Sequence, residues 1–208
     1  LPYIGNLAVL RNPAGRVSYP LSFDNLAGKP LYIVNGENDP LYPAARIQPF
    51  IDLMARANVD HTFRIIPNGG HNTQWLPEER PAIERFKSEH VRDPLPDRVQ
   101  WATDRTDRYN RNHWLRIDTL ITPGQPGRVV VERRGNVFDV TSFGVRDFTL
   151  LLSPDEVDFG QPVQVLVNGT GVLAGHVEPS EQTLLTWAAR DRDRTMLFAA
   201  ELPIRVPE

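Results

Sequence analysis

The chain contains no cysteine, which excludes disulfide bonds, a thiolate nucleophile and cysteine-ligated metal sites. No apolar run approaches the roughly 18 residues that a membrane-spanning helix needs, and no signal peptide is recognisable, so no membrane span is expected. An excess of one charge is also lacking. The formal net charge is -3 with both signs mixed, and this offers no basic surface for nucleic acid.

The chain does have enough apolar sequence for a folded core. Its 208 residues are 40% hydrophobic, which suits one large domain or two small ones. The first residue is Leu1, and the sequence begins in mid-pattern, so we expect the chain to be a fragment of a longer protein. Residues 3–10 are expected to form a short helix. No metal, nucleotide or flavin motif is present, so no cofactor is expected.

The segment from Lys29 to Trp75 has the pattern of a strand, a helix and a second strand. Pro30 to Val34 is a short run of β-forming apolar residues, which predicts a strand buried on both faces. Apolar residues recur at helical spacing after Pro43, and residues 62–66 form a second β-like run. Short loops between these elements predict a parallel βαβ pair.

Asp39 and His71 lie in the loops that follow the two predicted strands. Ligands of parallel sheets bind beyond the carboxyl ends of the strands, so both residues are expected at a functional edge. Each residue also has an ordinary explanation. Asp39 precedes Pro40, and aspartate favours turns because it bonds to its own backbone. His71 follows two glycines, where a histidine bonded to a carbonyl would also be unremarkable.

An acid followed by a histidine indicates acyl-transfer chemistry. A nucleophilic serine needs a base to take its proton, and the base needs a carboxylate to hold its tautomer and stabilise the imidazolium. In α/β-hydrolases the chain order is serine, acid, histidine. Asp39 and His71 are 32 residues apart and fit the second and third places in that order.

The motifs "LYIVNGENDPLYPA" and "NGGHNTQW" resemble the C-terminal part of an α/β-hydrolase of the prolyl oligopeptidase or esterase type. The resemblance covers about the first 75 residues. It implies that Asp39 is the catalytic acid and His71 the base, and that the substrate is an ester or a peptide. Trp75 would line the substrate pocket, although a tryptophan beside a helix start is more often a packing residue.

The nucleophile of such a hydrolase is absent from the sequence. No Gly-x-Ser-x-Gly elbow occurs, and the oxyanion-hole donor that follows the nucleophile is therefore missing too. Ser18 and Ser22 precede Asp39 in the right order but lack flanking glycines and a following helix. We therefore expect the serine elbow to lie in an N-terminal remainder of the same protein, and this chain to be inactive alone.

Beyond residue 96 the pattern changes to short β-like runs separated by turns. An amphipathic helix over residues 78–90 is expected to pack on the sheet, and the prolines after it predict a boundary between domains at 1–95 and 96–208. The Asn168-Gly169 pair predicts a type I′ hairpin. Ser180 predicts a helix cap. The predicted fold is α/β followed by a mainly antiparallel, β-sandwich-like domain with one short helix.

The segment "TLLLSPDEVDFGQPVQVLVNG" looks like the accessory domain that trails some large secreted bacterial esterase-like proteins, which favours a secreted or periplasmic location. The alternative is a non-catalytic binding protein whose β-domain recognises a polymer or partner. Trp101, Trp114 and Trp187 would then form a stacking platform, whereas a core role is the commoner one. Half a parallel sheet would leave an unpaired strand edge, so we expect either a partner fragment beside this one or self-association through the Pro30 to Val34 strand.

Overall fold

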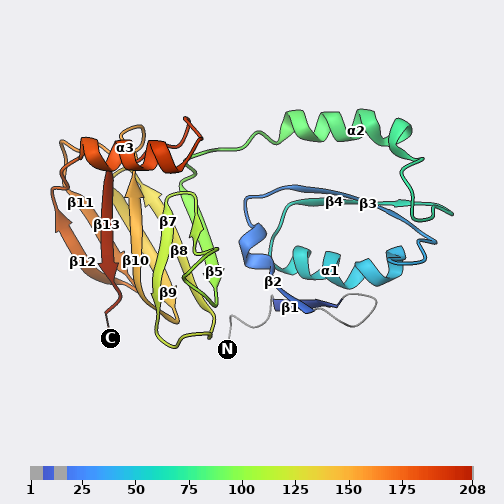
Figure 1. The fold of residues 1–208 in the computed structure, drawn as a ribbon, viewed down its shortest axis with the longest axis horizontal. Helices are drawn as coiled ribbons and strands as arrows, with labels where there is room; N and C mark the ends of the chain where they lie inside the picture. The colour runs from blue at the N-terminus through green and yellow to red at the C-terminus, as the bar shows by residue number, and fades with distance from the viewer. Residues whose placement is uncertain (1–6, 12–17, 208) are drawn as a thin grey trace. The chain divides into compact units, whose positions relative to one another are not determined.

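The computed structural model describes residues 7–11 and 18–207, with side chains described from Phe23 onward. It divides into two compact units, Leu1–Arg92 and Asp93–Glu208, each with its own elements (Figure 1). The fold is mixed α/β, with a small parallel βαβ sheet, mainly antiparallel sheets and three α-helices among the described residues. None of these helices is long and apolar enough to cross a membrane.

The first unit begins with a β-hairpin. β1 (Leu7–Arg11) pairs antiparallel with β2 (Ser18–Ser22), and the 3-10 helix η2 (Phe23–Leu26) follows. The expected helix over residues 3–10 is therefore wrong for residues 7–10, because pairing with β2 satisfies their backbone groups as a strand and overrides a weak local preference. Residues 3–6 lie outside the described residues.

The predicted parallel βαβ pair is confirmed. β3 (Leu31–Gly36) and β4 (His61–Ile66) pair in parallel, with Leu31 opposite His61, and α1 (Ala44–Arg56) connects them. The helix α2 (Leu76–Glu89) follows β4. Figure 1 shows α1 and α2 on opposite faces of the two strands.

Each face of this sheet packs differently. On the α1 side, an apolar cluster joins the sheet to the helix through Phe23, Ile51, Met54, Val59 and the half-buried Ile33 and Phe63. On the α2 side, Tyr32 packs edge-on against Phe86 and donates a hydrogen bond to the Glu79 carboxylate at 2.7 Å. β3 was expected to be buried on both faces. Only Gly36 of β3 is buried, because a two-stranded sheet is too narrow to cover its strands.

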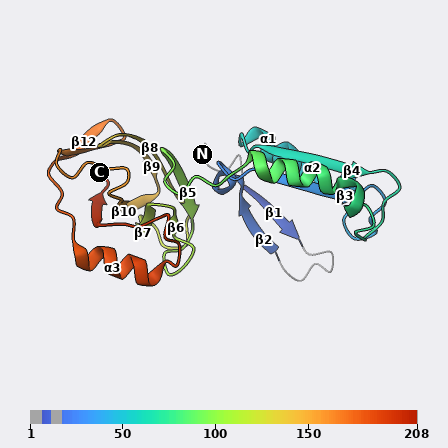
Figure 2. The same ribbon diagram turned by 90° about the horizontal axis from the view of Figure 1, so that it is seen from above.

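The second unit contains two sheets that lie face to face (Figure 2). One has the order β13-β10-β7-β6 and the other β12-β11-β9-β8-β5; β9 and β11 pair in parallel, and the remaining neighbours pair antiparallel. The strands are β5 (Arg98–Thr103), β6 (Arg111–Asn112), β7 (Leu115–Leu120), β8 (Gly127–Arg134), β9 (Val137–Phe143), β10 (Val145–Leu152), β11 (Val163–Val167), β12 (Thr170–Gly175) and β13 (Ala200–Arg205).

Alternating side chains of the two sheets form one large core. Along β8, Val129 and Val131 are fully buried while Glu132 is exposed, which is the period of two expected of a strand with one solvated face. The tryptophans belong to this core. Trp114 and Trp187 are 3% and 1% exposed, and Trp101 packs against the core while half-buried. Trp114 and Trp187 are therefore not available for an exposed stacking platform.

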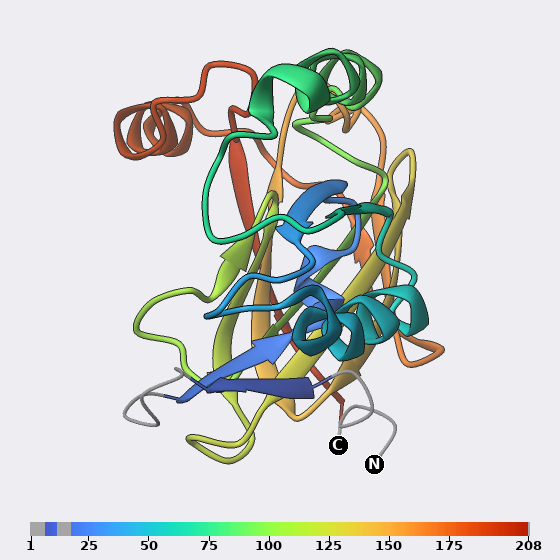
Figure 3. The ribbon, with the colours of Figure 1, turned by 90° about the vertical axis from the view of Figure 1, so that its right-hand side faces the viewer.

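The α3 helix (Glu181–Arg190) lies outside the sheets (Figure 3). Its predicted cap is confirmed, because the Ser180 hydroxyl accepts a hydrogen bond from the Thr183 amide at 3.2 Å. Leu185 on this helix is 56% exposed. Trp187 supplies the buried anchor and contacts Phe198 edge-on.

The segment before β5 is attached to the second unit. Leu95 is buried in its core, and the Trp114 indole donates to the Pro96 carbonyl at 2.9 Å. The backbone amide of Arg133 donates to the Asp97 carbonyl at 2.8 Å. The expected boundary between residues 95 and 96 therefore falls within this attached segment, slightly after the observed division at Arg92.

The hairpin between β11 and β12 provides a test of its turn. Asn168 and Gly169 have φ of 51° and 82°, the positive pair of a type I′ turn. We predict that Gly169→Ala lowers the free energy of unfolding by about 1 to 2 kcal/mol, because an L-residue is strained there although space is open. Urea unfolding followed by tryptophan fluorescence measures the change. Gly171→Ala, equally open and without positive φ, is the control, and an equal loss in both variants would contradict the prediction.

Candidate active site

Asp39 lies in the loop after β3 and is 7% exposed. One of its carboxylate oxygens, Oδ1, accepts hydrogen bonds from the backbone amides of Leu41 at 2.8 Å and Tyr42 at 2.9 Å. These bonds stabilise the charged form. The Tyr42 amide is the largest cause that lowers the pKa of Asp39 below its ordinary value of 3.8, and His71 and the Leu41 amide act in the same direction against the effect of burial.

His71 lies in the loop after β4, and the structure brings it to Asp39. Its Nδ1 is 2.8 Å from the second carboxylate oxygen, Oδ2, which is within the hydrogen-bond distance expected of an acid and base pair. An ionised carboxylate can only accept, so Nδ1–H is the donor. The His71 side chain is 58% exposed, and its Nε2 makes no hydrogen bond to any described residue. This leaves a ring nitrogen open to take a proton.

Parallel pairing of β3 and β4 explains why two distant residues meet. The carboxyl ends of parallel neighbours lie at the same edge, so both loops start side by side. Backbone bonds then join the loops: the Glu37 amide donates to the Ile66 carbonyl at 3.0 Å, and the Asn38 amide donates to the Gly69 carbonyl at 2.9 Å. The acid loop and the histidine loop are thus one connected structure.

Gly36 permits this connection. A Cβ built at Gly36 would lie 2.5 Å from the Gly69 carbonyl oxygen and 2.6 Å from that of Gly70, closer than real Cβ atoms approach backbone. Only glycine fits at this place without moving one of the loops apart. The glycine that ends β3 therefore sets the spacing between the loops of Asp39 and His71.

An open depression of about 500 Å³ lies over the pair. Its lining includes Trp75, whose indole donates to the Asn72 carbonyl at 2.8 Å. That Trp75 lines a substrate pocket stays a prediction. Asp39 is the only carboxylate and His71 the only basic side chain among the lining residues, which otherwise are Val34, Asn35, Gly36, Tyr42, Ile47, Gly70, Asn72, Thr73 and Trp75. The floor is therefore largely neutral.

No serine lines this depression among the described side chains. The hydroxyls that do line it belong to Tyr42 and Thr73, and neither follows a strand-to-helix elbow. Ser18 and Ser22 form the two ends of β2, and their side chains lie outside the described part of the chain. Asp39 and His71 are thus paired, and no serine among the described side chains accompanies them in this depression.

Sequence reasoning missed the residues that hold the acid loop. The Asn35 side-chain amide donates to the Tyr42 carbonyl and closes the loop around Asp39. Glu37 accepts from the Asn68 amide in the histidine loop at 2.9 Å. The sequence did contain one signal for this loop. An aspartate such as Asp39 often accepts hydrogen bonds from the backbone amides two and three residues after it, which stabilises a turn.

A second unexpected cluster lies between the sheet and α2. The Glu79 carboxylate is 8% exposed and pairs with Arg64 at 3.1 Å. Arg64 is the largest cause that lowers the pKa of Glu79, and Tyr32 adds to it. Burial, followed by the neighbouring carboxylate, raises the pKa of the Tyr32 hydroxyl. The cluster satisfies its own charges, and it fastens α2 to the sheet.

His90 forms the other histidine and aspartate pair of the first unit. Its Nε2 is 3.2 Å from Asp60 Oδ2, and its Nδ1 is 2.7 Å from the Phe86 carbonyl. Both ring nitrogens are thus occupied, unlike those of His71. No group of three or more metal-ligating side chains occurs within residues 7–11 and 18–207.

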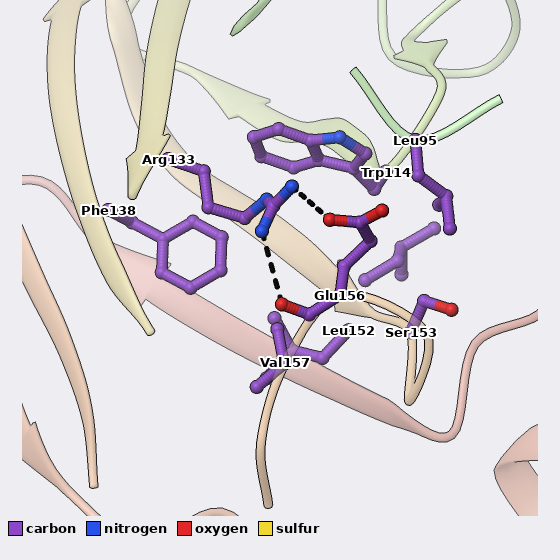
Figure 4. A pocket seen from close by; sticks show the side chains of 9 residues that line it. Leu95, Trp114, Arg133, Phe138, Leu152, Ser153, Glu156 and Val157 are labelled. Atoms are coloured by element: carbon purple, nitrogen blue, oxygen red, sulfur yellow. Dashed lines mark hydrogen bonds and ion pairs between the residues drawn. The ribbon is translucent and has the colours of Figure 1, made fainter. Parts of the chain in front are cut away.

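A second cavity lies inside the second unit and has room for about one water molecule, with a volume of about 10 Å³. Figure 4 shows Arg133 between Trp114 and Phe138, bonded to the carboxylate and carbonyl of Glu156. Its guanidinium also bonds to the Asp97 carboxylate. Core side chains and the ion pairs of Arg133 enclose this small space, and it belongs to the core of the second unit.

Comparison with known proteins gave no similarity: no family model, no curated protein and no solved structure matches the chain. The geometry of Asp39, His71 and the loops that hold them is therefore the basis for a functional proposal.

The close approach at Gly36 gives a direct test. We predict that Gly36→Ala separates the two loops and lowers the free energy of opening them by about 1 to 3 kcal/mol, the usual cost of overpacking. Native-state hydrogen exchange at the Glu37 and Asn38 amides measures this opening. Gly70→Ala is the control, since its Cβ would meet only the Asn72 side-chain amide at 3.6 Å. Unchanged exchange in Gly36→Ala would contradict the prediction.

The charge of Asp39 gives a second test. Because its folded pKa is lowered, Asp39 stabilises the folded chain above the ordinary aspartate pKa, and this contribution disappears as pH falls through the folded value. We predict that its carboxyl carbon titrates below 3.8 in NMR spectra and that the stability advantage of wild type over Asp39→Asn shrinks over that acidic range. An Asp39 carboxyl that titrates at or above pH 3.8 would contradict the lowered pKa.

Proposed function

We propose that this chain supplies the acid and the base of a serine hydrolase. In this proposal the first unit is the C-terminal part of an α/β-hydrolase domain, of the prolyl oligopeptidase or esterase type, and the second is a β-sandwich-like accessory domain. Asp39 is the catalytic acid and His71 the base. The reaction is acyl transfer from an ester or a peptide to a serine, which residues outside these 208 provide.

One observation carries the proposal. The buried carboxylate of Asp39 lies 2.8 Å from Nδ1 of His71, while Nε2 of the same ring makes no hydrogen bond to a described residue and His71 lines an open depression. A carboxylate that fixes one nitrogen and leaves the other free is the arrangement that a histidine base requires. His90 lacks this property, because both of its ring nitrogens are bonded.

The chemistry follows from this arrangement. Nε2 of His71 takes the proton of the serine hydroxyl as the oxygen attacks the substrate carbonyl, and later gives it to the leaving group. Asp39 stays ionised throughout, since two backbone amides lower its pKa, and it stabilises the imidazolium through Nδ1–H. The donors of an oxyanion hole would accompany the nucleophile, because one of them is the amide that follows it.

The partner in this proposal is the remainder of the same protein. Among the described residues, β3 and β4 pair only with each other, so both outer edges of the sheet are open to further strands. A strand from the remainder of the protein, or from a second copy of the chain, would pair with the open backbone groups along the outer edge of β3. The alternative of a binding module based on exposed tryptophans has less support, because Trp114 and Trp187 are buried.

The decisive experiment compares this chain with the longer native polypeptide that contains it. The chain alone is expected to hydrolyse activated esters and peptide anilides no faster than buffer. The longer polypeptide is expected to contain Gly-x-Ser-x-Gly roughly 50 to 100 residues before Asp39, to react with a fluorophosphonate at that serine, and to turn over substrate.

Variants of the longer polypeptide then test the base. His71→Ala is expected to lower kcat/KM by at least about a thousandfold, because the serine loses its proton acceptor. His90→Ala, which removes the other histidine paired with an aspartate, is expected to leave kcat/KM within about threefold. A native polypeptide without a serine elbow, or turnover that survives His71→Ala, would rule out the proposal.

A further inference from the structure

We propose that Glu37 is a positioning residue for His71, acting through the backbone of the histidine loop. This inference rests on the proposed function for its catalytic meaning, while its structural part concerns this chain alone. Glu37 lies two residues before Asp39 in the acid loop and does not line the depression, and its side chain makes no hydrogen bond to Asp39 or His71.

The histidine loop begins with a turn that leaves one amide without an internal partner. The Gly69 amide donates to the Ile66 carbonyl at 3.0 Å, which closes a β-turn over residues 66–69. Pro67 and Asn68 occupy its centre, and Asn68 has φ of 57°, the positive angle that a type II turn requires at that position. The Asn68 amide lies at the centre of the turn and takes no part in the closing bond.

The Glu37 carboxylate accepts that amide at 2.9 Å. Its backbone amide bonds in addition to the Ile66 carbonyl, and the Asn38 amide bonds to the Gly69 carbonyl. Three hydrogen bonds therefore join the acid loop to the turn. The one to Asn68 is charge-assisted, and it is the only one of the three that a side-chain substitution can remove.

His71 depends on this turn because little else holds it. Its side chain is 58% exposed, so packing restrains the ring weakly, and its bond to Asp39 requires that the loop deliver Nδ1 to within about 3 Å. The turn ends two residues before His71. A loosened turn therefore moves the ring away from Asp39 without disturbing Asp39 itself, whose other oxygen is bound within its own loop.

The test uses NMR of this chain and needs no nucleophile. Glu37→Ala is expected to speed hydrogen exchange at the Asn68 amide on the order of tenfold, and to shift His71 from the Nδ1–H tautomer toward a mixture in nitrogen-15 spectra. Glu37→Gln keeps an oxygen acceptor of the same length and is expected to restore both readouts to within about twofold of wild type.

Two further variants keep the result decisive. Glu84→Ala removes an exposed glutamate that pairs with Lys87 on α2, and it is expected to change neither readout. If Glu37→Ala loses its native spectrum, Glu37→Met takes its place, since it keeps the length and removes the strong acceptor. Wild-type exchange and tautomer in a folded Glu37→Ala or Glu37→Met chain would overturn the inference, as would equal effects of Glu37→Ala and Glu37→Gln.

In the longer polypeptide, Glu37→Ala is expected to lower kcat about tenfold with little change in KM, and Glu37→Gln to recover it. Suppose that Glu37→Ala loses the Nδ1–H tautomer of His71 but the longer polypeptide shows no His71-dependent turnover. This result would support the positioning role of Glu37 and overturn the hydrolase proposal. Turnover that depends on His71 but not on Glu37, with the His71 tautomer unchanged in the Glu37 variants, would support the hydrolase and overturn the positioning role of Glu37.

Discussion

The close approach of the β3 end to the loop after β4 is the constraint on which the first unit depends. Gly36 lies against the Gly69 and Gly70 carbonyls at a distance that no side chain tolerates. Parallel pairing brings the loops to one edge, and the missing Cβ lets them touch. The 2.8 Å bond between Asp39 and His71 follows from that contact, because both residues come within three positions of it.

Hydrogen bonds set the charge of Asp39 and the orientation of His71. Asp39 is nearly buried, which by itself would favour its neutral form, yet the Leu41 and Tyr42 amides keep it charged. His71 is mostly exposed and is oriented by hydrogen bonds instead of packing. The buried Asp39 carboxylate beside the accessible His71 ring is an arrangement suited to proton transfer. In the pair of His90 and Asp60 both ring nitrogens are bonded, and this pair lies at the end of α2.

Local sequence signals predicted much of this fold. The βαβ unit, the Asn168-Gly169 hairpin and the Ser180 cap are each set by neighbouring residues whose backbone preferences agree with the structure. Predictions failed where contacts with residues distant in the sequence determine the local structure. Residues 7–10 form a strand because β2 pairs with them, and β3 is mostly half-buried because its sheet has only two strands among the described residues.

The sequence by itself determined the types and order of the candidate site residues: an acid after one strand, a histidine after the next, and no serine elbow. Only the tertiary structure decided that Asp39 and His71 touch, that Asn35 and Glu37 hold their loops, and that Trp114 and Trp187 are buried. The physical reason is the range of the interactions. Turns, caps and strand patterns are encoded within a few residues, whereas distances between loops depend on sheet register and on close contacts across more than thirty residues of chain.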